Sequence, residues 1–318
     1  MPPLASRPIA QKIIIDTDPG QDDAVAILSA LASPEELEVL AITAVAGNVP
    51  LSLTLRNALA LVELANRPEV PVYRGAPRPM VKDLVTAEYV HGPTGLDGAD
   101  LPPPALEPGR GNAVERIIEL IMENDDVIVC TLGPLTNIGL ALVMAPEIAP
   151  RIKQLVMMGG GFFEGGNTTP AAEFNVFVDP HAAHVVFTSG IPLVMMPLDV
   201  THKALGTPDR LQRFKDLGSR AGDAVYGMLD FYDRWDMEKY GMPGAPIHDA
   251  CVVAYLLDPD MFGGKHVSVE IDTAPGPTEG MTVVDWWGVT GRPPNCTVMN
   301  KIDADSFFDL LVDRIGRL

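Results

Sequence analysis

Short apolar segments alternate with amphipathic helical patterns along most of this 318-residue chain. Strands are expected at 12–16, 37–43, 70–73, 126–132, 154–158 and 191–196. Helical patterns lie between them, such as Ala24, Ile27, Leu28 and Leu31 at i, i+3, i+4 and i+7. Strands that are apolar throughout and are joined by helices form parallel sheets covered on both faces. The alternation therefore predicts an α/β fold with a mostly parallel, doubly wound sheet covered by helices.

The pattern changes in the last third of the chain. The region near 205–245 is more helical, and we expect it to form a cap. Short strand-like segments follow at 267–271, 281–285 and 296–300, before a C-terminal helix. No linker or repeat separates these parts, so we expect residues 1–318 to form a single domain. The long connection at 75–111, rich in Pro and Gly, is a candidate lid or substrate loop.

The charge balance limits the partners of this chain. It has 23 basic and 42 acidic residues and a net charge of −19, which argues against nucleic acid and anionic membranes as partners. No apolar run reaches the roughly 18 residues of a membrane span, and the first residues do not read as an apolar leader. The three cysteines lack CxxC spacing and are expected to be buried free thiols. We therefore expect a cytoplasmic protein that acts on a small molecule.

Four carboxylates lie within eight residues at the carboxyl end of the first expected strand: Asp16, Asp18, Asp22 and Asp23. One or two of them could cap the next helix, but capping does not need four. Packing them together raises their pKa values unless a cation compensates, so a hard divalent ion is expected. An EF-hand is excluded, because Ile27 occupies the position where its loop requires Glu.

Other polar segments are expected at the same edge of the sheet, because each follows a strand or begins a helix. These segments are 47–48, 132–137, 159–175 and 247–249. Glycines in 159–175 allow close backbone approach to a ligand, and Asn167, Glu173 and Asn175 offer hydrogen bonds. A neutral, polyhydroxylated ligand suits such groups better than a phosphate does.

Five motifs resemble the nucleoside hydrolase family, the calcium-dependent N-ribohydrolases of the inosine/uridine-preferring type. They are DTDPGQDDA at 16–24, GN at 47–48, LGPLTN at 132–137, GNTTPAAEFN at 166–175 and HD at 248–249. The resemblance covers almost the whole chain in order. It implies a single α/β domain, assembled as a homodimer or homotetramer, with Ca²⁺ as cofactor. The implied metal ligands are Asp18, Asp23, Asp249 and the backbone carbonyl of Leu132.

The resemblance also implies how a ribonucleoside is bound. Its sugar would contact Asp22, Asn48, Met158, Asn167, Glu173 and Asn175, with Phe174 lining the ribose pocket. The 2′- and 3′-hydroxyls would face the metal, Asp22 and Asn175, whereas Asn167 and Glu173 would hold the 5′-hydroxyl. Poor reaction of 2′-deoxynucleosides follows, since they lack one metal ligand.

The implied reaction is hydrolysis of the N-glycosidic bond of inosine, uridine or cytidine to free base and ribose. Asp18 would activate a Ca²⁺-bound water, and His248 is the candidate acid for the leaving base. His91 would line the base pocket from the loop. The helical stretch 222–240, which contains Tyr226, Tyr232 and Trp235, is expected to form the second wall of the base pocket. These residues leave the choice between purine and pyrimidine open.

Two other interpretations compete with this one. A phosphatase of the haloacid dehalogenase type also has Asp-x-Asp after an apolar strand and would use Asp16 as nucleophile with Mg²⁺. It would need a cationic group for the phosphate, and none is adjacent to the motif. A calcium-stabilised ribose-binding protein would bind nucleosides without turnover, but the presence of both Asp18 and His248 argues against it.

Overall fold

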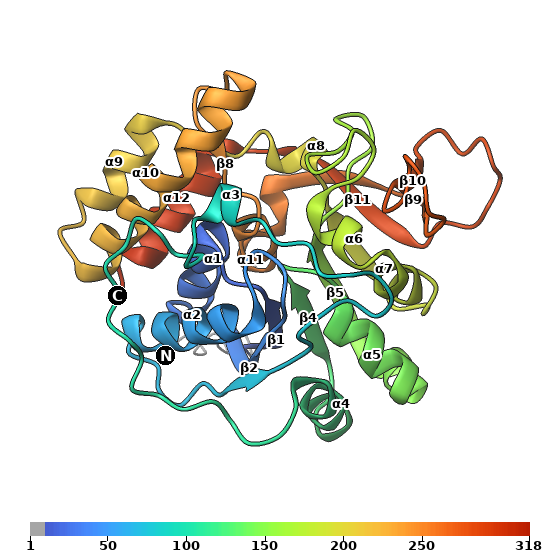
Figure 1. Cartoon of the computed structure of the whole chain (residues 1–318), viewed down its shortest axis with the longest axis horizontal. Coiled ribbons are helices and arrows are strands. Elements are labelled where there is room, and N and C mark those ends of the chain that lie inside the picture. Colours follow the sequence, from blue (N-terminus) through green and yellow to red (C-terminus); the bar gives the residue numbers. More distant parts are fainter. Residues whose placement is uncertain (1–9) are drawn as a thin grey trace, which may run out of the picture.

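A mostly parallel sheet forms the centre of the molecule (Figure 1). The computed structural model describes residues 10–318, apart from the side chains of residues 233–240. Within this part, nine strands are hydrogen-bonded in the order β10-β9-β11-β6-β5-β4-β1-β2-β3. All neighbouring pairs from β11 to β3 are parallel, whereas β9 is antiparallel to both β10 and β11. The strands are β1 (Gln11–Thr17), β2 (Leu37–Ala44), β3 (Val72–Arg74), β4 (Val127–Thr131), β5 (Ile152–Met158), β6 (Leu193–Met196), β9 (Phe262–Ile271), β10 (Thr282–Asp285) and β11 (Cys296–Ile302).

Helices cover both faces of the sheet because successive side chains of each strand point to opposite faces. Ile13 and Ile15 of β1 join the core formed with α1, α2, α9, α10, α11 and α12, whereas Ile14 joins the core formed with α4, α5 and α7. The helices are α1 (Gln21–Leu31), α2 (Leu51–Leu64), α4 (Ala113–Glu123), α5 (Thr136–Met144), α7 (Pro180–Phe187), α9 (Pro208–Lys215), α10 (Arg220–Tyr240), α11 (Ala250–Leu257) and α12 (Ala304–Ile315). The expected single α/β domain with helices on a mostly parallel sheet is confirmed.

Short elements next to the carboxyl ends of the strands were missed by the sequence patterns. They are the helices α3 (Glu88–His91), α6 (Phe174–Val178) and α8 (Leu198–Thr201), and the paired strands β7 (Leu205–Gly206) and β8 (Ala245–Pro246). Elements of two to five residues are too short to show a hydrophobic period. The strand expected at 70–73 is β3, two residues later, and the one expected at 267–271 begins at Phe262.

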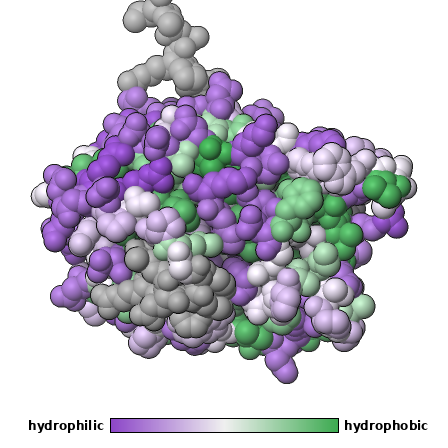
Figure 2. Space-filling model, turned by 90° about the horizontal axis from the view of Figure 1, so that it is seen from above, coloured by the Kyte–Doolittle hydropathy of each residue, from purple (hydrophilic) through white to green (hydrophobic). Residues whose placement is uncertain are grey.

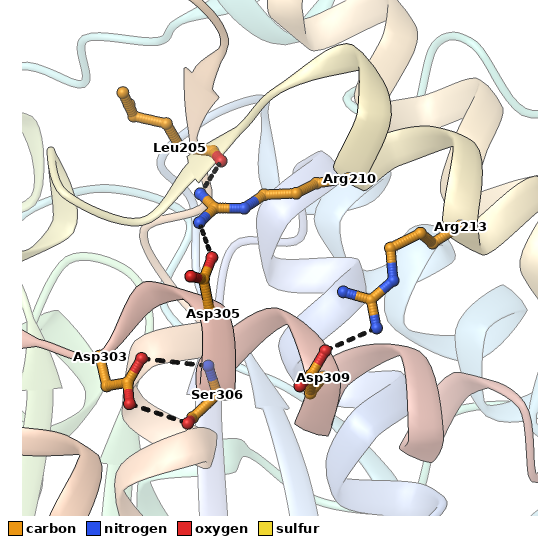
Figure 3. A network of polar contacts seen from close by, with 7 residues as sticks. All are labelled: Leu205, Arg210, Arg213, Asp303, Asp305, Ser306 and Asp309. Carbon is orange, nitrogen blue, oxygen red and sulfur yellow. Dashed lines mark hydrogen bonds and ion pairs between the residues drawn. The ribbon is translucent and has the colours of Figure 1, made fainter.

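The expected cap consists of α9 and α10, and polar contacts attach it to α12 (Figure 3). Arg210 donates to the carbonyl oxygen of Leu205 at 2.8 Å and to Asp305 at 2.6 Å, and Arg213 donates to Asp309 at 2.7 Å. The carboxylates of the two pairs are exposed, so each pair contributes at most about 1 kcal/mol. Burial of Phe214 and Leu211 in the core contributes more of the free energy that holds the cap in place than these ion pairs do.

The face of the molecule drawn in Figure 2 is mostly hydrophilic. Apolar side chains occupy smaller groups between the hydrophilic ones. Among the residues described, no helix has both the length and the hydropathy of a membrane-spanning segment. All three cysteines are buried and unpaired, as expected.

Candidate active site

The residues singled out in the sequence meet in a pocket beyond the carboxyl ends of β1, β4 and β5. The pocket is partly open to solvent. Its lining includes Asp22, Asn48, His91, Leu132, Met158, Asn167, Glu173, Phe174, Asn175, His248 and Asp249. Asp18 and Asp23 do not line the pocket and are fully buried. The parallel topology brings these segments together, as expected.

Three carboxylates form an acidic centre at one side of the pocket. Oxygens of Asp22, Asp23 and Asp249 lie within 4.8 Å of one another. Burial raises the pKa of Asp22 to about 7 and, together with repulsion from Asp22 and Asp23, raises that of Asp249 well above its usual range. Asp23 also accepts hydrogen bonds from Thr17 and from the backbone amide of Gly20, so it does cap α1. Capping accounts for one of the four acids in the motif.

Asp18 lies in a tight space beside this centre. Its Oδ2 accepts a hydrogen bond from the amide of Asn48 at 2.8 Å, and its buried Oδ1 has no partner within the described residues. A Cβ atom on Gly47 or Gly133 would overlap with this carboxylate, so both turns need glycine to approach it. Burial, followed by repulsion from Asp23, raises the pKa of Asp18 well above its usual range.

The four acids fit a divalent cation with oxygen ligands. In the part of the chain that is described, no Lys or Arg forms an ion pair with Asp18, Asp22, Asp23 or Asp249. A cluster of buried acids with an unpartnered oxygen calls for a compensating positive charge. Hard cations such as Ca²⁺ and Mg²⁺ take ligands of this kind. The three carboxylates whose oxygens lie within 4.8 Å of one another include Asp22 in addition to the expected ligands Asp23 and Asp249. Asp18, the other expected carboxylate ligand, is not among these three.

Other polar groups that line the pocket are held by backbone contacts. Glu173 begins α6, where it accepts from the amides of Gly160 at 2.8 Å and Asn175 at 2.9 Å. Asn175 donates to the carbonyl of Leu132 at 2.8 Å, which leaves this oxygen one lone pair for another partner. Asn167 accepts from the amide of Phe174 at 3.0 Å. Burial raises the pKa of Glu173 to about 7.

Two histidines line the remaining wall. His248 Nδ1 is 2.7 Å from Thr201 Oγ1, and the His91 ring stacks on Tyr232 with 5.4 Å between the centroids. Burial lowers the pKa of His248 well below its usual value and that of His91 to about 3. Burial therefore disfavours the charged form of both rings.

Residues 222–240, which were expected to form the second wall of the base pocket, contribute to it only in part. Tyr232 lines the pocket, whereas Tyr226 packs against the core and under Lys215. The Trp235 side chain lies outside the described residues. Sequence reasoning missed Ala87, Tyr89, Val90 and Thr168 in the lining, and Thr201 beside His248. Most of these residues lie close to His91 or Asn167 in the sequence, and this proximity is the one feature that could have identified them as pocket residues.

Fold and site together define an α/β enzyme with a polar pocket and an acidic centre able to hold a metal. The family model described as inosine-uridine preferring nucleoside hydrolase matches residues 13–309. The chain therefore belongs to this family of metal-dependent hydrolases, as the motifs indicated, and the phosphatase interpretation is wrong. Asp16, the nucleophile it required, accepts hydrogen bonds from Thr43 and Asn137, neither of which lines the pocket.

Individual relatives and structures agree with the family. A pyrimidine-specific ribonucleoside hydrolase, RihA, of Salmonella paratyphi B is 47% identical over 96% of this chain and 99% of its own length. An uncharacterized protein of Schizosaccharomyces pombe is 50% identical over the same shares. A purine-preferring ribonucleoside hydrolase from Gardnerella vaginalis is similar in structure, with a TM-score of 0.90 at 33% identity, covering 96% of this chain and 98% of that one.

Proposed function

We propose that this enzyme hydrolyses the N-glycosidic bond of ribonucleosides to free base and ribose, with a preference for pyrimidine ribonucleosides. The observation that carries the proposal is the buried Oδ1 of Asp18, which has no partner among the described residues, beside three acids at a pocket lined by amides and histidines. The 47% identity to a pyrimidine-specific hydrolase exceeds the 33% identity to a purine-preferring one, which favours uridine and cytidine.

The proposed cofactor is Ca²⁺, held by Asp18, Asp23, Asp249 and the carbonyl of Leu132. Carboxylates combined with a backbone carbonyl suit the flexible shell of 6–8 oxygens that Ca²⁺ prefers. When bound, the ion supplies positive charge that keeps these carboxylates ionised and makes an adjacent water a stronger acid. Asp22 and Asn175 bind the 2′- and 3′-hydroxyls in this proposal, and Asn48 and Met158 contact the same ribose.

Individual side chains of the protein carry out separate steps of the proposed reaction. Asp18 Oδ1 accepts a proton from the water that attacks C1′ on the face opposite the base, and ribose leaves with inverted configuration. The transition state resembles an oxocarbenium ion, which the anionic side of the pocket stabilises. Asn167 and Glu173 hold the 5′-hydroxyl, while Phe174 excludes water from the ribose.

His248 is the proposed proton donor to the departing base. Replacing His248 by Gln is expected to lower kcat for uridine by about 10² to 10⁴. The same variant is expected to hydrolyse 4-nitrophenyl β-D-ribofuranoside within about tenfold of the unsubstituted enzyme, because nitrophenolate leaves without a proton. Steady-state rates on both substrates measure this, and an equal loss on both contradicts the role.

Ribose release measured by a reducing-sugar assay tests the proposed function. The substrates are uridine, cytidine, inosine and adenosine, each with calcium-loaded enzyme. We expect release from all or some of them, fastest from uridine or cytidine. Absence of release from all four, with the protein folded and calcium-loaded, would overturn the proposal.

A further inference from the structure

We propose that Gln21 fixes the tautomer of His91, so that this histidine presents a hydrogen-bond acceptor to the base pocket. The enzyme would thereby favour nucleobases with an N–H donor on the edge that faces His91. Gln21 lies within the acidic motif but takes no part in the chemistry proposed above. The part of this inference that concerns substrate rests on the proposed function, whereas the tautomer does not.

The contacts of the Gln21 amide determine its orientation. Gln21 is fully buried at the start of α1 and reaches the loop at 75–111. Its Nε2 donates to the carbonyl oxygens of His91 at 2.9 Å and Asp97 at 3.2 Å, and its Oε1 is 2.8 Å from His91 Nδ1. Carbonyl oxygens only accept hydrogen bonds, so the amide nitrogen has to face them. A flipped amide would place its oxygen against two other oxygens and lose both bonds.

This orientation assigns the hydrogen on the imidazole. Because Gln21 Oε1 is an acceptor, His91 Nδ1 must carry the hydrogen, and a neutral imidazole carries only one. Nε2 is then an acceptor. Burial supports the neutral state, since it lowers the pKa of His91 to about 3.

The surroundings leave Nε2 as the group that His91 offers to a ligand. A Cβ atom on Gly20 would overlap with Nδ1 and Cε1, so this part of the ring packs against the turn before α1. Tyr232 stacks on the ring. Within the described residues, the His91 side chain has no hydrogen bond other than that to Gln21, although His91 is only 7% exposed and lines the pocket. A buried, unpartnered acceptor favours a ligand that brings a donor.

Uridine fits this requirement in one way. When uracil is attached to ribose, N3–H is the one N–H group that the base retains. A methyl group on N3 removes the donor, so 3-methyluridine cannot satisfy His91 Nε2. Cytosine can offer its exocyclic amino group instead.

The tautomer can be measured without any substrate. Long-range ¹H–¹⁵N correlation spectra of calcium-loaded, ¹⁵N-histidine-labelled enzyme distinguish Nδ1–H from Nε2–H rings, and loss of one of the six histidine patterns in His91→Asn assigns His91. We expect an Nδ1–H pattern in the unsubstituted enzyme and loss of this pattern in Gln21→Met. An Nε2–H pattern in the unsubstituted enzyme would overturn the proposal, whether or not the variant folds.

The kinetic test compares uridine with 3-methyluridine in Gln21→Met and in a matched control, Asn57→Ala. Asn57 holds the same loop by donating to the carbonyls of Pro19 at 3.1 Å and Thr94 at 2.9 Å, and it makes no hydrogen bond to His91. We expect the kcat/KM ratio of uridine to 3-methyluridine to fall about tenfold in Gln21→Met, the value of one hydrogen bond. The ratio is expected to stay unchanged in Asn57→Ala.

Comparing ratios cancels the steric effect of the methyl group, because it is present in every enzyme form. An unchanged ratio in Gln21→Met, or an equal fall in both variants, would overturn the specificity role. If the unsubstituted enzyme releases no ribose from uridine, the proposed function fails while the spectra still decide the tautomer.

Discussion

Replacing Asp18 by Asn is expected to lower kcat/KM for uridine by about 10² to 10⁴, the usual contribution of a general base. The substitution preserves shape, and the amide oxygen can still accept the hydrogen bond that the Asn48 amide donates at 2.8 Å. What it removes is the negative charge and the basicity of the buried oxygen that has no partner among the described residues. Steady-state kinetics of ribose release, together with circular dichroism to verify the fold, measure this effect.

Asp16→Asn is the matched control for this experiment. Asp16 is also fully buried, two positions earlier in the motif, but its hydrogen-bond partners do not line the pocket, whereas Asn48, the partner of Asp18, does. The Oδ1 of Asp16 accepts hydrogen bonds from Thr43 and Asn137, and its Oδ2 has no partner in the described part of the chain. The new amide group can therefore replace Oδ2 without breaking either bond. We expect its kcat/KM to stay within about tenfold of the unsubstituted enzyme. Equal losses in both variants would contradict the role of Asp18.

Discrimination between uridine and 2′-deoxyuridine is the second large effect. We expect kcat/KM for the deoxynucleoside to be lower than that for uridine by a factor of at least about 10⁴. Sites built around a substrate hydroxyl reject analogues that lack it by this factor. Without the 2′-hydroxyl, the groups proposed to bind it, Asp22, Asn175 and the metal, lose a partner in a buried site. The ratio of kcat/KM values for the two nucleosides gives the result directly.

5′-Deoxyuridine serves as the comparison. It lacks the 5′-hydroxyl, which in this proposal contacts Asn167 and Glu173 and not the metal ligands. We expect a smaller loss than for 2′-deoxyuridine. If kcat/KM for uridine exceeded that for 2′-deoxyuridine by less than about tenfold, the result would contradict the proposal that the metal centre holds the ribose diol.

Most of the sheet and the acidic motif could be predicted because both depend on local pattern and parallel topology. The fully apolar segment of β1 identifies a strand buried on both faces, and the carboxyl ends of parallel strands meet at one edge. Asn48, Glu173 and Asp249 therefore had to lie near Asp18 even though they are far apart in the chain. Their convergence in one pocket needed no knowledge of side-chain positions.

The base side of the pocket could not be predicted in the same way. Tyr89 and Val90 belong to the long loop at 75–111, which has no hydrophobic period, and Tyr232 comes from a helix whose aromatic residues could equally have packed in the core. Long-range contacts set the place of this loop, such as the one between Gln21 and the carbonyl of His91. Such a contact leaves no signal in the sequence, because a Gln at a helix start is ordinary.

The measurement that tests the central claim most directly is ribose release from uridine by enzyme stripped of metal and then titrated with Ca²⁺. The account predicts that the stripped, folded enzyme releases no ribose and that activity returns in proportion to added Ca²⁺ up to one ion per chain. Mg²⁺ is the control ion, since it demands a more rigid octahedral shell. Full activity of enzyme verified to be free of metal would contradict the account.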